Sequence, residues 1–261
     1  MATEPTDGAA TARVTELWHY PVKSMQGITV DRLSATDQGF GLDRQYAVID
    51  AVTARVLSAK TVRALLDADV RVGADGAVVI AAPGCDPVSV LDPGVDAALS
   101  AWLDRPVLVR ERTHSDHGGY DMTFDPPDDD AEQYEIPMPE GSFFDLATVH
   151  LLSTASVAAA RDARPDIDWD VRRFRPNVVV DAGEEPFVED AWVGRTVRLG
   201  EVTVSVQQPT VRCAMPLRAQ PGLDRAVDVY RTLDTLHANH LGVYGAILGA
   251  GEVRVGDELG V

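Results

Sequence analysis

Short runs in which apolar and polar residues alternate, separated by glycine turns, fill most of the chain. The first runs are VTELWHYPV from Val14, GITVDRLSA from Gly27 and RQYAVID from Arg44. Alternation with a period of two residues is typical of strands that bury one face. Further strands are expected at residues 54–59, 69–73, 77–81, 88–91, 106–111, 177–181, 195–199, 201–207 and 252–259.

Three segments have the spacing of helices instead, in which apolar residues recur every three or four positions. They are residues 94–103, 155–163 and 222–236, and Ser153 or Thr154 can cap the second of them. Many short strands with few helices favour a mainly β fold with peripheral helices, an α+β arrangement built around a barrel-like sheet.

The stretch from Asp121 to Gly141 differs from the rest in composition. It is rich in acidic residues and prolines, as in the run Asp125 to Asp130. Such sequence is typical of a solvated loop and, less often, of a site where a partner docks. We therefore divide the chain into a tail at 1–12, a first β unit at 13–120, a connection at 121–141 and a second unit at 142–261.

The acidic composition argues against some partners. The chain has 41 acidic and 23 basic residues, a formal net charge of −18, and no run of Lys or Arg. Nucleic acids and anionic membranes are bound by basic surfaces, so neither is expected as a partner. The N-terminal residues do not resemble a signal or transit peptide, and no segment has the length and apolar character of a membrane span. We therefore expect a cytoplasmic protein.

Cys213 is the first candidate for chemistry. It is one of two cysteines, with Cys85, which are too few for a site of four thiolates. It follows a predicted strand, and Arg212 beside it favours the thiolate, the form that binds metal. A lone cysteine is more often an inert core residue. If this one holds a metal, the other ligands must come from a cofactor or from distant histidines.

Cationic and amide side chains gather at the ends of predicted strands, in YPVKSMQG, GLDRQY and RRFRPN. Guanidinium groups match phosphates and the polar edges of heterocycles. In an extended segment, Arg173 and Arg175 point the same way. Surface ion pairs with the abundant acids explain the arginines equally well. The candidates are Lys23, Ser24, Arg44, Arg172, Arg173, Arg175 and Asn177.

Two segments with histidine are weaker candidates. HSDHGG places His114, Asp116 and His117 at a spacing suited to a metal, but a polar loop explains the segment better. His150, which precedes LLS, is expected to be a packed strand residue. The sequence contains no Walker loop, nucleophile elbow or Rossmann glycine pattern.

Six motifs follow one another in an order that can be compared with known families. They are YPVKSMQG, GLDRQYAVID, RFRPNVVVD, EDAWVG, PTVRCAMP and GEVRVGD. Together they resemble the MOSC family, which includes the mitochondrial amidoxime-reducing component and the C-terminal domain of molybdenum cofactor sulfurase. The resemblance covers residues 14–261. It implies a β-barrel-like MOSC domain preceded by a MOSC N-terminal β domain.

The resemblance also implies a cofactor and a role for each candidate. Cys213 matches the cysteine that coordinates molybdenum and is the implied catalytic residue. The dithiolene of the molybdenum cofactor, Mo-molybdopterin, would supply the sulfur ligands that this chain lacks. The residues implied in cofactor binding are Lys23, Ser24, Arg44, Arg173, Arg175, Asn177, Thr210 and Arg212.

The activity implied by the resemblance is that of a molybdenum oxidoreductase that reduces N-hydroxylated small molecules. Two cysteines leave no room for a fused iron–sulfur module, so the electrons must come from a separate protein. A carrier or sulfur-handling protein that binds the cofactor without turnover is the alternative, and a MOSC fold reused without molybdenum is a third. Many relatives have hydroxyl residues where this chain has Met215 and Pro216, and some have an acidic residue at Thr154, so catalytic detail does not transfer.

Overall fold

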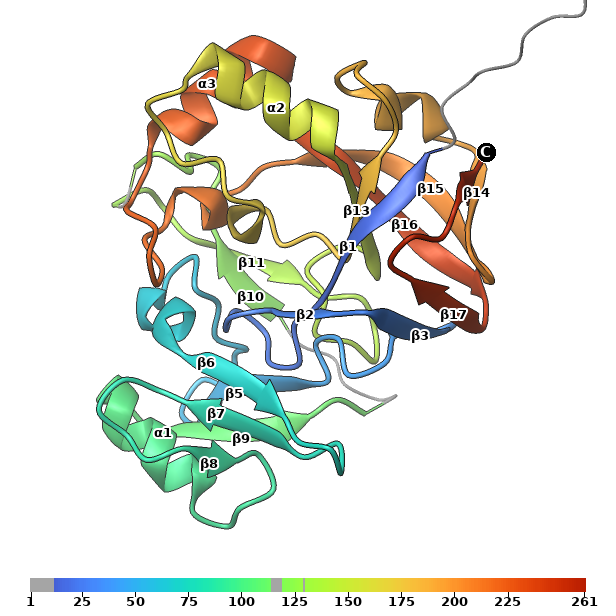
Figure 1. The fold of residues 1–261 in the computed structure, drawn as a ribbon. Helices are drawn as coiled ribbons and strands as arrows, with labels where there is room; N and C mark the ends of the chain where they lie inside the picture. The colour runs from blue at the N-terminus through green and yellow to red at the C-terminus, as the bar shows by residue number, and fades with distance from the viewer. Residues whose placement is uncertain (1–11, 114–118, 129) are drawn as a thin grey trace, which may run out of the picture.

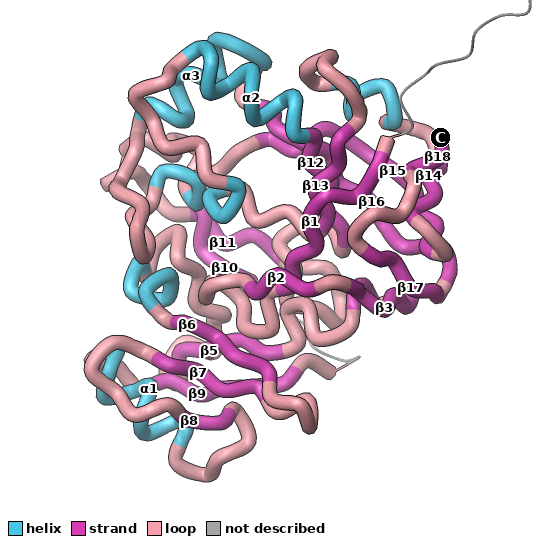
Figure 2. The backbone as a smooth tube through the Cα atoms, viewed as in Figure 1, coloured by secondary structure: helices cyan, strands magenta, loops and turns pink. Residues whose placement is uncertain are grey.

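Strands make up most of the regular structure in the computed structural model, which describes residues 12–113, 119–128 and 130–261 (Figure 1, Figure 2). The largest sheet has eight strands, of which β12 and β13 pair in parallel. The predicted fold class, mainly β with peripheral helices, is confirmed. In spatial order the strands are β18 (Leu259–Gly260), β14 (Thr196–Leu199), β15 (Val202–Val211), β16 (His240–Gly249), β12 (Val149–Ser153), β13 (Val178–Asp181), β1 (Arg13–His19) and β2 (Ile28–Val30).

The eight-stranded sheet curls around a core made largely of valine and leucine side chains. In β1, Val14 and Leu17 are both buried, although an odd number of positions separates them. Strict alternation would place them on opposite faces of the sheet. A register shift against β13 between Val14 and Glu16 corrects this, because the extra residue returns Leu17 to the core side.

Strands from the first β unit complete this core. β1 pairs with β13, and β3 (Arg32–Thr36) pairs with β17 (Gly251–Arg254) and with β4 (Gly39–Phe40). Leu33 and Phe40 then pack in the same cluster as Val253. The loop that follows β1 is thereby carried to the point where β12 and β13 begin.

A second core, in the lower part of Figure 1, is formed mostly by residues 46–109, together with Val22, Met25 and Met215. Its sheets are β5–β9 and β6–β7–β8, and the predicted helix at 94–103 is confirmed as α1. Met215 packs against this core, and Cys213 lies at its edge. The elements are β5 (Tyr46–Asp50), β6 (Asp69–Val72), β7 (Val78–Ala81), β8 (Val88–Ser89), α1 (Val95–Leu103), β9 (Val107–Glu111) and a 3-10 turn at Arg63–Asp67.

Two further helices pack together near the top of Figure 1. α2 (Thr154–Ala163) begins as predicted, since the Ser153 side chain accepts a hydrogen bond from the Ala155 N–H. α3 (Asp228–His237) begins six residues later than predicted. Gly222 has a φ of +77°, and the backbones of Gln220 and Leu223 bond to each other, so the chain turns here instead of forming a helix.

The prediction of an irregular connection at 121–141 is wrong in part. β10 (Gly119–Met122) and β11 (Tyr134–Pro137) form a hairpin across it. The hairpin is stabilised because Tyr120 packs with Phe143 in a small core of its own. The strand predicted at 54–59 is also wrong, since only Val56 forms a bridge there. In the described part of the chain, no helix is long and apolar enough to cross a membrane.

Candidate functional site

A pocket forms where the loop after β1 meets β12, the start of β13 and the segment after β15. Seven of the nine residues predicted to bind a cofactor or metal line it, whereas Arg173 and Thr210 do not. Its lining is Lys23, Ser24, Arg44, Phe144, Asp145, Leu146, Ala147, His150, Phe174, Arg175, Asn177, Arg212, Cys213, Met215 and Tyr244.

Three of these residues have a backbone conformation that side chains rarely adopt. The φ angles of Ser24, Arg44 and Arg175 are +68°, +48° and +56°. Left-handed conformations cost energy in residues other than glycine, and they concentrate at functional sites. The surrounding hydrogen bonds hold them, as when the Arg44 N–H donates to the carbonyl of Tyr20.

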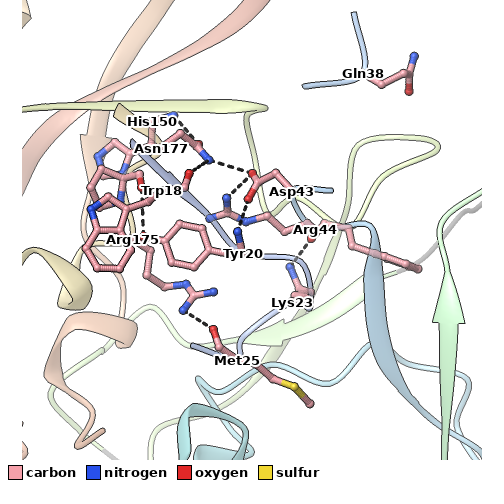
Figure 3. Close-up of polar contacts among 12 residues, drawn as sticks. Trp18, Tyr20, Lys23, Met25, Gln38, Asp43, Arg44, His150, Arg175 and Asn177 are labelled. Atoms are coloured by element: carbon pink, nitrogen blue, oxygen red, sulfur yellow. Dashed lines mark hydrogen bonds and ion pairs between the residues drawn. The ribbon is translucent and has the colours of Figure 1, made fainter. Parts of the chain in front are cut away.

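Tyr20 is the platform on which two of the arginines lie. The guanidinium carbons of Arg175 and Arg44 are 4.1 Å and 4.5 Å from the centre of its ring (Figure 3). The Tyr20 hydroxyl donates to the carbonyl of Pro176 at 3.1 Å, and its burial raises the pKa of that hydroxyl. Gly27 packs so closely on this ring that a Cβ at position 27 would overlap it. The ring is therefore fixed, and the cations are fixed on it.

A buried carboxylate, Asp43, connects the loop to the second unit. It accepts hydrogen bonds from the Tyr20 N–H at 2.7 Å and from the Asn177 amide at 3.0 Å, and it pairs with Arg44 (Figure 3). The side-chain oxygen of Asn177 accepts from the backbone N–H of His150 at 3.1 Å. The Asn177 side chain thus joins three segments of the site, and Asp43 compensates the charge of Arg44.

Arg175 retains a donor without a partner. Its Nη1 donates to the carbonyl of Met25 at 2.7 Å, while its Nη2 is buried with no hydrogen-bond partner among the described residues. Burial lowers the pKa of Arg175 to about 10, which leaves it charged at neutral pH. A buried guanidinium with an unmatched donor, lining a pocket, is suited to an anionic ligand.

Arg212 and Cys213 come next to each other in the chain and both line the pocket. Arg212 donates from Nη2 to the carbonyl of Phe174 at 2.9 Å, and its buried Nε has no partner among the residues described. Cys213 is partly exposed and has no disulfide. Its side chain therefore lines the pocket. A thiol sealed in apolar packing would have argued against a metal ligand.

Two lysines share one carboxylate beside this thiol. Lys23 and Lys60 pair with the two oxygens of Asp145, the latter at 2.7 Å, and Lys23 also donates to the carbonyl of Phe143. Burial lowers the pKa of Lys23 to about 8. Burial also acts to lower the pKa of Lys60, but Asp145 and Cys213 outweigh it and raise that pKa. The two ammonium groups outweigh the burial of Asp145 and hold its pKa far below the ordinary range.

Comparison with known protein families identifies most of the chain. The MOSC domain matches residues 139–260, and the MOSC N-terminal beta barrel domain matches residues 11–102. The chain belongs to the MOSC family. These two matches confirm, at the level of the family, the resemblance drawn from the six motifs. MOSC domains are known to bind the molybdenum cofactor.

Solved structures resemble this MOSC protein only distantly. YuaD from Bacillus subtilis shares 13% identity over 95% of this chain and 94% of its own, with a TM-score of 0.45. A hypothetical protein shares 12% identity over 97% and 68%, with a TM-score of 0.43. YiiM from Escherichia coli shares 14% identity over 44% and 55%, with a TM-score of 0.31. No curated protein matches the chain.

Arg173, which was predicted to bind the cofactor, points away from the pocket. Its three donor nitrogens contact the carbonyls of Asp168, Pro216 and Asp224 at 2.8, 3.2 and 2.9 Å. Residues 171–173 form a 3-10 turn, so the extended geometry that would align Arg173 with Arg175 is absent here. Arg173 braces the turn at Met215–Leu217, two residues after Cys213.

The remaining predicted residues lie elsewhere. The Thr210 side chain is fully buried in β15, and its hydroxyl has no partner among the described residues. Arg172 forms an ion pair with Asp170, as the surface interpretation expected. His114, Asp116 and His117 lie outside the described residues. His150 is a buried strand residue as expected, but its ring also lines the pocket.

Three charged residues of the site were not predicted, namely Asp43, Lys60 and Asp145, and neither was the aromatic ring of Tyr20. Asp43 precedes Arg44 in GLDRQY, and that position was a usable signal. Lys60 and Asp145 lie in segments with no motif of their own, and only the fold brings them to Lys23.

Proposed function

We propose that this protein binds the molybdenum cofactor in the pocket and holds its metal through the thiolate of Cys213. One observation carries the proposal: a partly exposed thiol and four cationic side chains line a single pocket in a chain of net charge −18. A thiolate suits a thiophilic metal, and the cations suit an anionic pterin phosphate.

The cations differ in how much charge they can offer. Arg44 is compensated by Asp43, and Lys23 by Asp145. Arg175 and Arg212 each keep a buried nitrogen without a partner among the described residues. These two arginines would therefore contribute most to holding the anionic cofactor. Lys23, Ser24 and Arg44 would lie around it, and Asn177 would hold the segments of Asp43 and His150 in place.

We further propose that the protein is an oxidoreductase that reduces N-oxygenated small molecules. When bound, the cofactor supplies two-electron chemistry coupled to transfer of an oxygen atom. Reducing an N-hydroxyl compound to the N–H compound takes two electrons and two protons and releases water. The apolar side chains of Phe144, Leu146 and Met215 offer contacts for an organic substrate at the pocket, and a separate protein would donate the electrons.

Elemental analysis tests cofactor binding. Molybdenum and pterin are measured per chain after expression in a host that makes the cofactor, for the parent, Cys213→Ser, Arg175→Ala and the exposed control Arg231→Ala. We expect nearly one molybdenum per chain in the parent and the control. Cys213→Ser should lose the spectroscopic signature of thiolate ligation, and Arg175→Ala should retain less cofactor. Equal molybdenum and unchanged spectra in all four proteins would contradict the assignment.

Reoxidation separates an enzyme from a carrier. The parent protein is reduced chemically and mixed with a hydroxylamine or an amidoxime. An oxidoreductase is reoxidised as the amine or amidine forms, whereas a carrier or sulfur-handling protein remains reduced and yields no product.

A further inference from the structure

His150 lines the pocket from β12 and is held firmly in place. It is 4% exposed, its N–H donates to the Asn177 side chain, and its carbonyl accepts from the Asn177 N–H at 2.8 Å. The edge of its ring meets Tyr244, with the ring centres 5.3 Å apart. A Cβ at position 242 would lie 2.5 Å from its Nε2, so the glycine there leaves the space that the ring fills.

The His150 ring lies next to the two arginines that keep a buried nitrogen without a hydrogen-bond partner among the described residues, Arg212 and Arg175. Its Nε2 lies 3.5 Å from Nη1 of Arg212 and 3.3 Å from the carbonyl of Leu241. Hydrogen bonding to the backbone carbonyls of Leu241 and Arg175 acts to raise the pKa of the ring. Burial and then Arg212 lower the pKa of His150 well below its usual value, so the ring is neutral and carries one N–H.

A neutral ring can carry its proton on Nδ1 or on Nε2. With the proton on Nδ1, it donates to the Arg175 carbonyl and keeps a lone pair on Nε2 for Arg212. The Leu241 carbonyl, 3.3 Å from Nε2, then accepts from Nη1 of Arg212 instead of from the ring. We propose that His150 is a positioning residue, which orients the Arg212 guanidinium and fixes the strained backbone at Arg175 without cancelling the charge of either arginine. This inference deepens the proposed function, on which its cofactor test rests.

Arg212 is held by uncharged groups, so its positive charge is not neutralised within the protein. A carboxylate would orient a guanidinium more strongly but would also neutralise it, as Asp43 does for Arg44. The described groups that accept hydrogen bonds from Arg212 are the carbonyls of Phe174 and Leu241 and the ring of His150, all uncharged. The positive charge of Arg212 is thus left for a ligand in the pocket.

The tautomer can be measured without any cofactor. The cofactor-free parent, made in a host that lacks cofactor synthesis, is labelled with 15N-histidine and 15N-arginine, and His150→Gln and Arg212→Lys assign the signals. We expect a neutral His150 protonated on Nδ1 at pH 7, and slowly exchanging Arg212 guanidinium protons. A ring protonated on Nε2 alone, or on both nitrogens, would overturn the proposal because Nε2 could not then accept from Arg212.

Two variants test the consequence for the site. Glutamine keeps a neutral acceptor, while phenylalanine keeps the ring shape without one. We expect Arg212 proton exchange to stay slow in His150→Gln and to quicken in His150→Phe, and cofactor retention after dialysis to fall about tenfold in His150→Phe only. Equal behaviour of the two variants would overturn the inference. A parent without molybdenum would instead refute the proposed function, while the tautomer and exchange results would still decide the role of His150.

Discussion

At the scale of single residues, the carboxylate of Asp145 is the counter-charge for two buried ammonium groups. The side chains of Lys23 and Lys60 are 5% and 2% exposed, whereas that of Asp145 is 32% exposed. Asp145→Asn removes the negative charge that both lysines share, although Lys23 keeps its hydrogen bond to the Phe143 carbonyl. We therefore expect the free energy of unfolding to fall by about 3 kcal/mol, the lower end for a broken buried pair. Lys60→Met leaves Asp145 paired with Lys23, so no buried charge is left uncompensated and the loss should be clearly smaller. Urea denaturation at pH 7 measures both.

The control for this pair of variants is Arg231→Gln, which removes an exposed ion pair with Asp228. Its denaturation midpoint should match that of the parent, because exposed pairs contribute little. A larger loss in Lys60→Met than in Asp145→Asn would show that Asp145 is not the shared counter-charge.

The neutral ring of His150 also predicts a loss of stability in acid. Burial and Arg212 lower its pKa in the folded protein, so below about pH 6.5 the unfolded chain binds a proton that the folded chain does not. Stability therefore rises with pH across this window and is lost as the pH falls below 6.5, by at most about 1.4 kcal/mol per pH unit from this residue. Urea denaturation at pH 7, 6 and 5 should show a flatter dependence in His150→Gln. Parallel curves for the two proteins would exclude this contribution.

The residue types and motifs of the site were predictable, but the directions of its side chains were not. Cys213, Arg212 and Arg175 could be selected from sequence because cations and a thiol are conspicuous in an acidic chain. Arg173 looked equivalent to Arg175 because they alternate. It points elsewhere because a 3-10 turn ends at Arg173 and Arg175 itself is left-handed, and neither conformation has a signal in RRFRPN.

At the scale of elements, β16 depends on one glycine to pass His150. Gly242 has a φ of +80°, and the register of β15 against β16 shifts between Pro209 and Val211, so an extra residue of β16 bulges there. Gly242→Ala would place a Cβ 2.5 Å from His150 and 2.6 Å from the carbonyl of Leu151. We expect a loss of about 3 kcal/mol in the free energy of unfolding, from left-handed strain and overlap together.

The same strand supplies the control. Gly249 has no positive φ, and a Cβ there would meet no heavy atom within 4 Å. Gly249→Ala should therefore leave the free energy of unfolding, measured in urea, within about 0.5 kcal/mol of the parent value. If both alanine variants are equally stable, the close approach of β16 to His150 does not constrain the fold.

The elements that sequence patterns missed share a physical cause. β16 reads HLGVYGAILG, in which three glycines interrupt the alternation, and its bulge breaks the period further. β11 lies in a stretch of prolines and acids, and pairing with β10 forms it. The helices and most strands were found because their spacing is regular, whereas these strands depend on distant partners that no local pattern records.

At the scale of the whole molecule, the two matched segments do not fold as separate bodies along the chain. β1 and β2 belong to the eight-stranded sheet, and Val14, Leu17, Leu33 and Phe40 are buried in its core. The pocket repeats this pattern, since Lys23, Ser24 and Arg44 come from the first segment and Arg175 and Cys213 from the second. The sheet and the site are therefore built from residues of both segments.

This arrangement predicts that residues 139–261 alone will not form a stable fold, although they contain the whole MOSC match. Without β1, the edge of β13 is unpaired, and the core loses the side chains that β1, β3 and β4 insert into it. Exposed apolar surface and an open strand edge favour aggregation. The full chain should unfold in urea in a cooperative transition, while the fragment should show no sharp transition by circular dichroism. A sharp transition in the fragment would mean that β1 lies on a sheet already complete without it, and the first segment would then be needed for the pocket only.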